Sequence, residues 1–375
     1  MKMYIQPISE QELEQYLAIP DLTADKKHAI GMLSDKIIQY VKSAHGNSDV
    51  RVYRRKPIVT VKNNYDNLLI ADDNISRSST YTHYIDEKHI LRTHTSAEIP
   101  VILRELSKQE GWDDVVILLP GLAYRRDVTD KKHVGQVHML EVWRVVKRSK
   151  VFEIKKADLL EVVKGVAKTA APGWDLRIVS SPHPYTDQGI EVNACKSGQD
   201  IEILECGLIK PEILNNAGLD PKTYSGWALG MGLDRLVMTL KGIPDIRYLR
   251  SENPGIAAQM VDLLPYKEVS HQPSIKRDMS YCVPKTYVEE DINEDIRKAL
   301  GANMNILESV EVISETPAED LPDVILERLG CKPDQKNILV RITLRHLEKS
   351  LTNGQANKIY DDIYSKINYG SGGYN

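Results

Sequence analysis

The chain has 375 residues, a formal net charge of −4 and a hydrophobic fraction of 42%. These values predict an ordinary soluble globular protein of two or three domains. The longest apolar run, near Val115 to Leu119, stops at Pro120 and is far too short to cross a bilayer. Met1 to Ile5 is not followed by the apolar core of a signal peptide. We therefore expect a cytoplasmic protein without a membrane partner.

The residue usage contains two further signals. The cysteines are scattered and form no CxxC pair, which is typical of reduced, mostly buried thiols in a cytosolic protein. They are Cys195, Cys206, Cys282 and Cys331. Phe152 is the only phenylalanine, against 18 tyrosines.

In chain order, the first predicted elements are two helical patterns over residues 9–45, with a cap in the Asp-Leu-Thr-Ala-Asp junction near residue 23. Strands and helices then follow one another without regular βαβ alternation, which favours an α+β fold with a mostly antiparallel sheet. The expected extended segments are 51–61, 80–93, 115–119 and 190–208, and the expected helices are 96–109, 158–171 and 232–240. Tyr124 to Asp127 and Val137 to Val146 are expected to form the arms of a long hairpin.

After a connector, the remaining residues predict a second compact unit of strand, helix, strand, strand and helix. This split βαββα order is ferredoxin-like. The expected segments are 278–283, 288–300, 309–314, 337–344 and 354–367.

Two motifs combine cations with glycines. The first runs from Gly121 to His133 and continues from His138 to Glu141, placing basic groups on two strands and their loop. The second, Ser225 to Arg235, is a glycine-spaced strand-to-helix turn that ends in an arginine. Cations at the phosphates, and glycines where backbone must approach a ligand, suit a bent nucleoside triphosphate.

Together the two motifs resemble motifs 2 and 3 of class II aminoacyl-tRNA synthetases, specifically of the phenylalanyl type. The phrases Leu91 to Ala97 and Gly242 to Arg247 follow the same family. Ser274 to Ser280 and Arg345 to Thr352 resemble its ferredoxin-fold anticodon-binding domain. The resemblance covers roughly residues 50–368 and is closest to the single-chain, mitochondrial-type enzyme.

The resemblance implies a domain order. The expected parts are an N-terminal helical segment (1–50), a class II synthetase-like catalytic domain (51–258), a connector (259–272), a ferredoxin-fold anticodon-binding-like domain (273–369) and a disordered tail (370–375). It also implies a ligase that uses ATP and Mg²⁺ to form an aminoacyl-adenylate and transfers the amino acid to tRNA. The last module contains more acidic than basic residues, so its RNA binding stays open. Monomer and homodimer also stay open.

The resemblance assigns roles to individual residues. Arg125 and Arg235 are the expected catalytic cations, and Glu202 is the expected Mg²⁺ ligand. The expected ATP-binding residues are Arg125, His133, Val137, Gly230, Gly232 and Arg235. The expected amino-acid-binding residues are His94, Ser96, Met139, Glu141, His183, Tyr185, Glu205 and Ala228, with Glu141 as the counter-charge to the ammonium group.

The expected pocket for the amino acid side chain departs from the family pattern. The family's Phe-Pro-Phe is His183-Pro184-Tyr185 here, its Phe-His-Gln is Val137-His138-Met139, a second Gln is Ile99, and a Gly is Glu205. A buried carboxylate without a partner is costly, so Glu205 must face away or meet a donor. Three functions remain open: a phenylalanine enzyme, a paralogue that activates another amino acid for another acceptor, and a non-catalytic RNA-binding or regulatory protein. From the pocket we predict that phenylalanine is a poor substrate.

Overall fold

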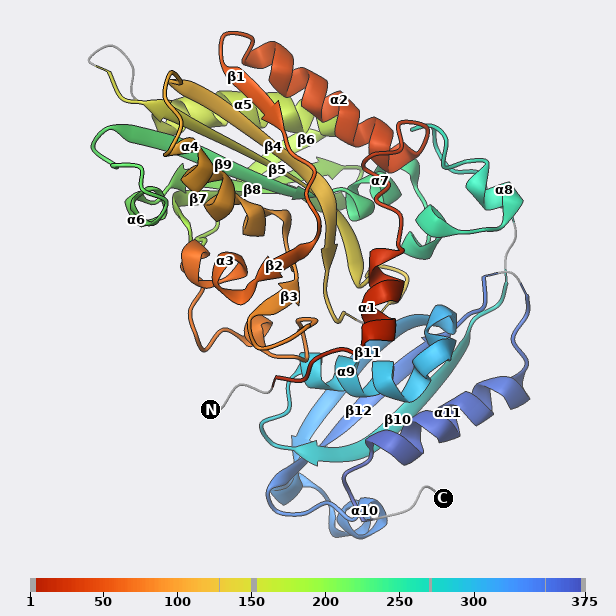
Figure 1. Cartoon of the computed structure of the whole chain (residues 1–375). Helices are drawn as coiled ribbons and strands as arrows, with labels where there is room; N and C mark the ends of the chain where they lie inside the picture. Colours follow the sequence, from red (N-terminus) through yellow and green to blue (C-terminus); the bar gives the residue numbers. More distant parts are fainter. Residues whose placement is uncertain (1–4, 128, 150–153, 270–271, 348, 372–375) are drawn as a thin grey trace. The chain divides into compact units, whose positions relative to one another are not determined.

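The computed structural model describes residues 5–127, 129–149, 154–269, 272–347 and 349–371, which form two compact units (Figure 1). The first unit comprises residues 1–125, 136–243 and 259–266, and the second comprises residues 126–135, 244–258 and 267–375. In the described ranges, none of the helices combines the length and the apolar character that crossing a membrane requires.

The first unit is built on a 7-stranded sheet with the order β1-β4-β5-β9-β8-β7-β6. β1 and β4 pair in parallel, and the other neighbours pair antiparallel, so the α+β prediction is confirmed. The strands are β1 (Asp49–Val52), β4 (Asp114–Tyr124), β5 (Gln136–Lys147), β6 (Asp175–Ser180), β7 (Thr186–Lys196), β8 (Gln199–Ile209) and β9 (Tyr224–Gly232).

β4 continues through Pro120, which corrects the prediction that the apolar run stops there and that the hairpin arm begins at Tyr124. β1 pairs with β4 only as far as Leu118, where the Tyr53 amide donates to the Leu118 carbonyl at 2.8 Å. The backbone of residue 120 faces the same side as that of residue 118, beyond the end of β1. Because no partner strand there requires an amide hydrogen, proline is tolerated.

Helices cover both faces of this sheet (Figure 1). α4 and α6 pack on the face that carries Ile117 and Trp143, whereas α2 and α5 lie on the opposite face. The helices of the unit are α1 (Glu10–Leu17), α2 (Ala29–Ala44), α3 (Val61–Asn64), α4 (Ile99–Leu106), α5 (Lys156–Ala170), α6 (Pro211–Asn216) and α7 (Asp234–Lys241), with 3₁₀ turns η1 (Asp66–Leu68), η2 (Ile75–Arg77) and η3 (Thr95–Glu98).

Three local predictions need correction. α2 is capped by the His28 side chain, which accepts from the Ile30 amide, and not by the junction near residue 23. The strand expected over 51–61 is divided into β1 and β2 (Ile58–Thr60) around Pro57. Only β3 (His89–Leu91) is a strand within the extended segment expected over 80–93, where turns occupy much of the remainder.

The second unit contains a 3-stranded antiparallel sheet with the order β10-β12-β11 and one hydrophobic core beneath α9 and α11. The predicted order of strand, helix, strand, strand and helix is present, with α10 added between the last two strands. The elements are η4 (Ile246–Arg250), α8 (Pro254–Ala257), β10 (Ile275–Pro284), α9 (Glu289–Leu300), η5 (Gly301–Ile306), β11 (Leu307–Pro317), η6 (Ala318–Asp320), α10 (Asp323–Leu329), β12 (Gln335–Leu344) and α11 (Asn353–Ile367).

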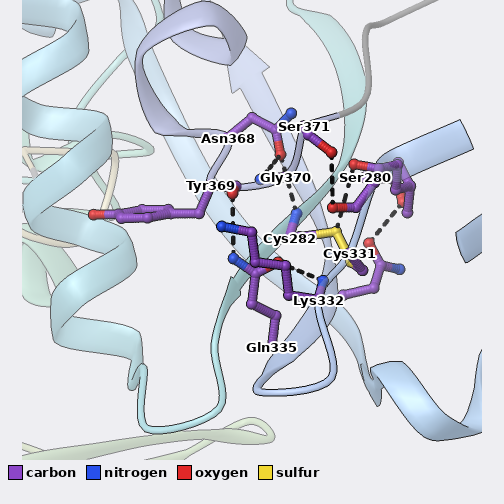
Figure 2. Close-up of a disulfide and its surroundings, with 12 residues drawn as sticks. Ser280, Cys282, Cys331, Lys332, Gln335, Asn368, Tyr369, Gly370 and Ser371 are labelled. Carbon is purple, nitrogen blue, oxygen red and sulfur yellow. Dashed lines mark hydrogen bonds between the residues drawn. A yellow bond between two sulfur atoms is a disulfide. The ribbon is translucent and has the colours of Figure 1, made fainter. Parts of the chain in front are cut away.

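The expectation that all four cysteines are reduced is wrong. Cys282 in β10 and Cys331, just after α10, form a disulfide with their Cα atoms 5.6 Å apart (Figure 2). The Cys282 carbonyl also accepts from the Tyr369 amide at 3.0 Å, so the bridge adjoins the end of the described chain. The partners are separated by 49 positions in sequence and become neighbours only when β10 and α10 pack. Cys195 and Cys206 are free thiols, and Cys206 is buried.

Candidate functional site

Four residues form one row across four neighbouring strands of the first unit. Glu141 in β5 is opposite Gly230 in β9, Gly230 is opposite Glu205 in β8, and Glu205 is opposite Glu191 in β7. Residues that are directly opposite on neighbouring strands point to the same face of a sheet. The row therefore places three carboxylates on the face that α4 and α6 cover, with a glycine between two of them.

Glu141 is the buried end of this row. Only 2% of the residue is exposed. The Trp143 indole donates to its Oε2 at 3.0 Å, and the Ser96 hydroxyl donates to its Oε1 at 3.3 Å. Burial raises the pKa of Glu141 to about 7, although both hydrogen bonds act in the opposite direction. This carboxylate can therefore bind a cation, but it releases its proton only near neutral pH.

His94 and Tyr185 complete the polar network around Glu141. The Ser96 hydroxyl lies 2.9 Å from Nδ1 of His94. Burial lowers the pKa of His94 to about 3, so this imidazole is neutral at physiological pH. The Tyr185 ring stacks on Trp143 at a centroid distance of 5.6 Å, and its hydroxyl is hydrogen bonded to Ser96. Burial, followed by the charge of Glu141, raises the pKa of Tyr185, so this phenol stays protonated.

Glu205 is the more open end of the row, and it meets a donor. Its Oε1 lies 2.8 Å from Nε2 of His183, and its side chain is 43% exposed. The contact with Glu205 raises the pKa of His183, with smaller contributions from Glu202 and Glu191, whereas burial lowers it. His183 precedes the turn that leads into β7, where Gly189 is needed because a Cβ there would lie 2.9 Å from His183 Nδ1 and 2.2 Å from the Ser181 carbonyl oxygen.

A β-bulge brings Glu202 to the same face. Val192 is opposite Leu204 while Asn193 is opposite Glu202, so Ile203 is an extra residue in β8. In a regular strand, positions 202 and 205 would point to opposite faces. Burial, together with the charges of Glu205 and Glu191, raises the pKa of Glu202, and Arg235 lowers it.

Two cations border this face. Arg125 directly follows β4, donates from Nε to the Thr93 carbonyl at 3.1 Å and lies 5.7 Å from the Tyr81 ring centroid. Arg235 is exposed in the first turn of α7. Neither forms an ion pair with another described residue, whereas Arg92 and Arg144 contact Glu98 and Asp114. Guanidinium groups without carboxylate partners can accept an anion.

The other predicted residues are in three places. Val137 and Met139 in β5 and Ala228 in β9 point to the same face as Glu141. Gly232 is opposite Met139 and borders open space, since a Cβ there would meet no atom of the described residues within 4 Å, apart from its chain neighbours. His133 belongs to the second unit, where its Nδ1 lies 3.0 Å from Asp130 Oδ1.

Sequence reasoning missed two members of the site. Trp143 holds Glu141 from two positions along the same strand, and the period of two would have placed both side chains on one face. Glu191 extends the carboxylate row beyond Glu205, and its Oε1 accepts from Asn193 at 2.6 Å. The alternation of β7 was visible in sequence, but its alignment with β8 depends on a bulge and was not.

The metal prediction rests on Glu202 alone. Among the described residues, no group of three or more His, Cys, Asp or Glu side chains is arranged to hold a metal ion. Mg²⁺ commonly takes one or two protein carboxylates and completes its shell with water and phosphate oxygens. A single accessible carboxylate such as Glu202 therefore fits a Mg²⁺ ion that arrives with a nucleotide.

Known proteins that are similar in sequence to this chain include tRNA synthetases. The family model "tRNA synthetases class II core domain (F)" matches residues 15–260. The chloroplastic/mitochondrial phenylalanine–tRNA ligase of Arabidopsis thaliana is 29% identical over 361 residues, which cover 91% of this chain and 77% of that protein. A probable mitochondrial phenylalanine–tRNA ligase of Drosophila melanogaster is 27% identical over 398 residues, covering 90% and 83%. Among solved structures, pyrrolysyl-tRNA synthetase from Desulfitobacterium hafniense matches with a TM-score of 0.46 and 20% identity over 64% of this chain and 78% of that one.

Proposed function

Because the chain belongs to the family of class II tRNA synthetase core domains, we propose that it activates an amino acid with ATP and then charges a tRNA. The phenylalanine–tRNA ligases that it resembles align with most of their own length, which supports a synthetase of the phenylalanyl type. The observation that carries the proposal is that Glu141, a buried carboxylate of the sheet, lies on the face bordered by Arg125 and Arg235, neither of which forms an ion pair with another described residue.

The chemistry requires positioning and charge neutralisation more than covalent help. A carboxylate oxygen of the amino acid attacks the α-phosphorus of ATP, the bond to the bridging oxygen breaks, and pyrophosphate leaves. In our proposal, Arg125 binds the α-phosphate and the substrate carboxylate, whereas Arg235 neutralises the terminal phosphates. The open space at Gly232 and the missing side chain of Gly230 let the nucleotide and the amino acid approach the backbone.

The amino acid head group is proposed to bind at the buried end of the row. Glu141 supplies the negative charge for the ammonium group, and Ser96 and the neutral His94 supply hydrogen-bonding partners. Glu202 is the proposed protein ligand of Mg²⁺, which when bound neutralises phosphate charge. Val137 occupies the proposed position against the adenine ring.

Pyrophosphate exchange by the full-length protein tests the proposal, with the 20 standard amino acids assayed separately. Arg125→Ala and Arg235→Ala should each slow exchange on the order of 10² to 10³, because each removes a cation aimed at developing phosphate charge. Arg328→Ala, which removes an exposed arginine from α10, is the matched control and should leave the rate within about twofold, as is usual for surface changes. Exchange that is unaffected by both active-site changes would contradict the assignment. Charging of total tRNA with the preferred amino acid then tests the second step.

A further inference from the structure

A small cavity of about 10 Å³, which has room for one polar group at the tip of a side chain, borders Gly230. Its lining includes His183, Tyr185, Thr186 and Glu205. A Cβ on Gly230 would lie 2.6 Å from Glu141 Oε1, so only the bare backbone of residue 230 separates the cavity from that carboxylate. Neighbouring strands are about 4.8 Å apart, so Glu141 and Glu205 are roughly two strand spacings apart. A ligand whose ammonium group meets Glu141 can therefore extend its side chain toward Glu205.

The wall of the cavity is polar and acidic. Glu205 uses Oε1 to contact His183, and its side chain is 43% exposed, so Oε2 can still accept a hydrogen bond. Glu191 and Glu202 act on the same imidazole, and Arg235 acts on Glu202. Glu202 is the proposed Mg²⁺ ligand, and the two carboxylates that remain, Glu205 and Glu191, lie beside one imidazole, so this end of the site has an excess of acidic groups.

Thr186 supplies a second, independent indication. The residue is 5% exposed, and its Oγ1 has no hydrogen-bond partner among the residues that the structure describes. Oγ1 lies 2.7 Å from the place that a Cβ on Gly207 would occupy, so it faces the bare backbone of β8. Buried hydroxyl groups are rarely left without a partner. A polar ligand atom in the cavity would provide one.

Building on the proposed function, we infer that this cavity selects an amino acid whose side chain carries an N–H or O–H donor, cationic side chains foremost, over an unsubstituted aromatic ring. A bare ring would remove water from Glu205 and Thr186 without replacing its hydrogen bonds. A donor satisfies Glu205 Oε2, and a cationic donor also neutralises part of the excess negative charge. Sites with unpaired polar groups reject ligands that cannot pair with them far more strongly than apolar pockets reject a misfit methylene.

Equilibrium binding tests the selectivity without relying on catalysis. Calorimetry with the full-length protein, Mg²⁺ and a non-hydrolysable ATP analogue would compare phenylalanine, tyrosine, histidine, lysine and arginine. We expect the tightest ligand to carry a donor and to bind on the order of 10² more tightly than phenylalanine. Glu205→Gln should weaken that ligand about tenfold and phenylalanine hardly at all. The double change Glu205→Gly with His183→Phe should shift the preference toward phenylalanine.

Glu212→Gln is the matched control. It removes the same charge from an exposed position of α6, and residue 212 does not line the cavity. Its effect on the preference should stay within about twofold, as for a screened charge. Tightest binding of phenylalanine that is insensitive to Glu205→Gln overturns the inference, and so does the absence of binding by every amino acid. Selective binding of a donor-bearing amino acid without pyrophosphate exchange would support the inference but contradict the proposed function.

Discussion

The two ends of the carboxylate row differ in how they are held. Glu141 is buried, receives hydrogen bonds from Trp143 and Ser96, and lies on a central strand of the sheet. Glu205 is nearly half exposed and contacts one imidazole, that of His183, which lies outside the strands just before a turn. In the proposed function, the rigid end binds the ammonium group that all amino acids share, and the open end contacts the group that distinguishes them. Changes at the two ends should therefore have different consequences.

The largest effect on pyrophosphate exchange is expected from a substitution beside Glu141, at the rigid end of the row. In Gly230→Ala, the new Cβ would lie 2.6 Å from Glu141 Oε1, and the two hydrogen bonds to Glu141 oppose its displacement. Because misplacing a reactant by about 1 Å can cost 10²-fold, we expect pyrophosphate exchange to fall by that order for every amino acid. Gly46→Ala is the control, since its new Cβ would lie an ordinary 3.8 Å from the Ser43 carbonyl oxygen. If Gly230→Ala slowed pyrophosphate exchange with only one amino acid, the Glu141 end of the row would not bind the group that all amino acids share.

A tenfold effect is expected from pH. Below about pH 7 Glu141 holds a proton, so KM for the amino acid should rise toward tenfold per unit as pH falls. The folded protein then binds more protons than the unfolded chain between about pH 4.5 and 7. Over that window the free energy of unfolding should decrease as pH rises, by about 3 kcal/mol from this group.

The variant Glu141→Gln distinguishes the titration of the Glu141 carboxylate from that of other groups. Kinetics over pH 5.5 to 8.5, at roughly half-unit steps, and denaturant unfolding over the same window would be compared with the unmodified protein. The variant should lose both pH dependences. If it keeps the KM profile, another group controls the binding of the amino acid.

The smallest effect is expected from Ser96→Ala. The hydroxyl donates to Glu141 at 3.3 Å and lowers its pKa, so its removal should move the midpoint of the KM profile upward and raise KM a few-fold, the magnitude of one modest hydrogen bond. Steady-state kinetics across the same pH range would measure both. Ser365→Ala, at an exposed position of α11, is the control. A midpoint that moves downward would contradict the role of Ser96.

Regular, locally coded elements could be predicted from sequence. α5 was expected over 158–171 and spans Lys156–Ala170, because its apolar period and Pro172 define it locally. β6 and α10 were missed; α10 is short and flanked by polar loops, so its packing decides its formation. The prediction that the β4 strand stops at Pro120 was wrong. The sequence does not show where β1 ends, and it is the end of β1 at Leu118 that leaves the proline without a strand partner on that side.

In the candidate site, too, the features encoded locally could be predicted, and those that depend on the pairing of distant strands could not. Residue types and motif order indicated Glu141, Gly230 and Glu205, and the structure places them in one row. The neighbours that tune them depend on register between distant strands. Glu202 is on this face only because Ile203 is an extra residue, and no local pattern in β8 marks that position as a bulge.

The bridge between Cys282 and Cys331 also determines how the second unit would respond to cleavage. The segment it encloses includes α9, β11 and α10, with Val324 of α10 75% exposed. A protease that cut the backbone at such a point would leave both fragments covalently joined, and they would separate only after reduction. β11 and β12, which pair with each other, lie on either side of such a cut in the chain. Because the disulfide would keep the two fragments linked, re-forming this pairing would cost less entropy than bringing two separate chains together.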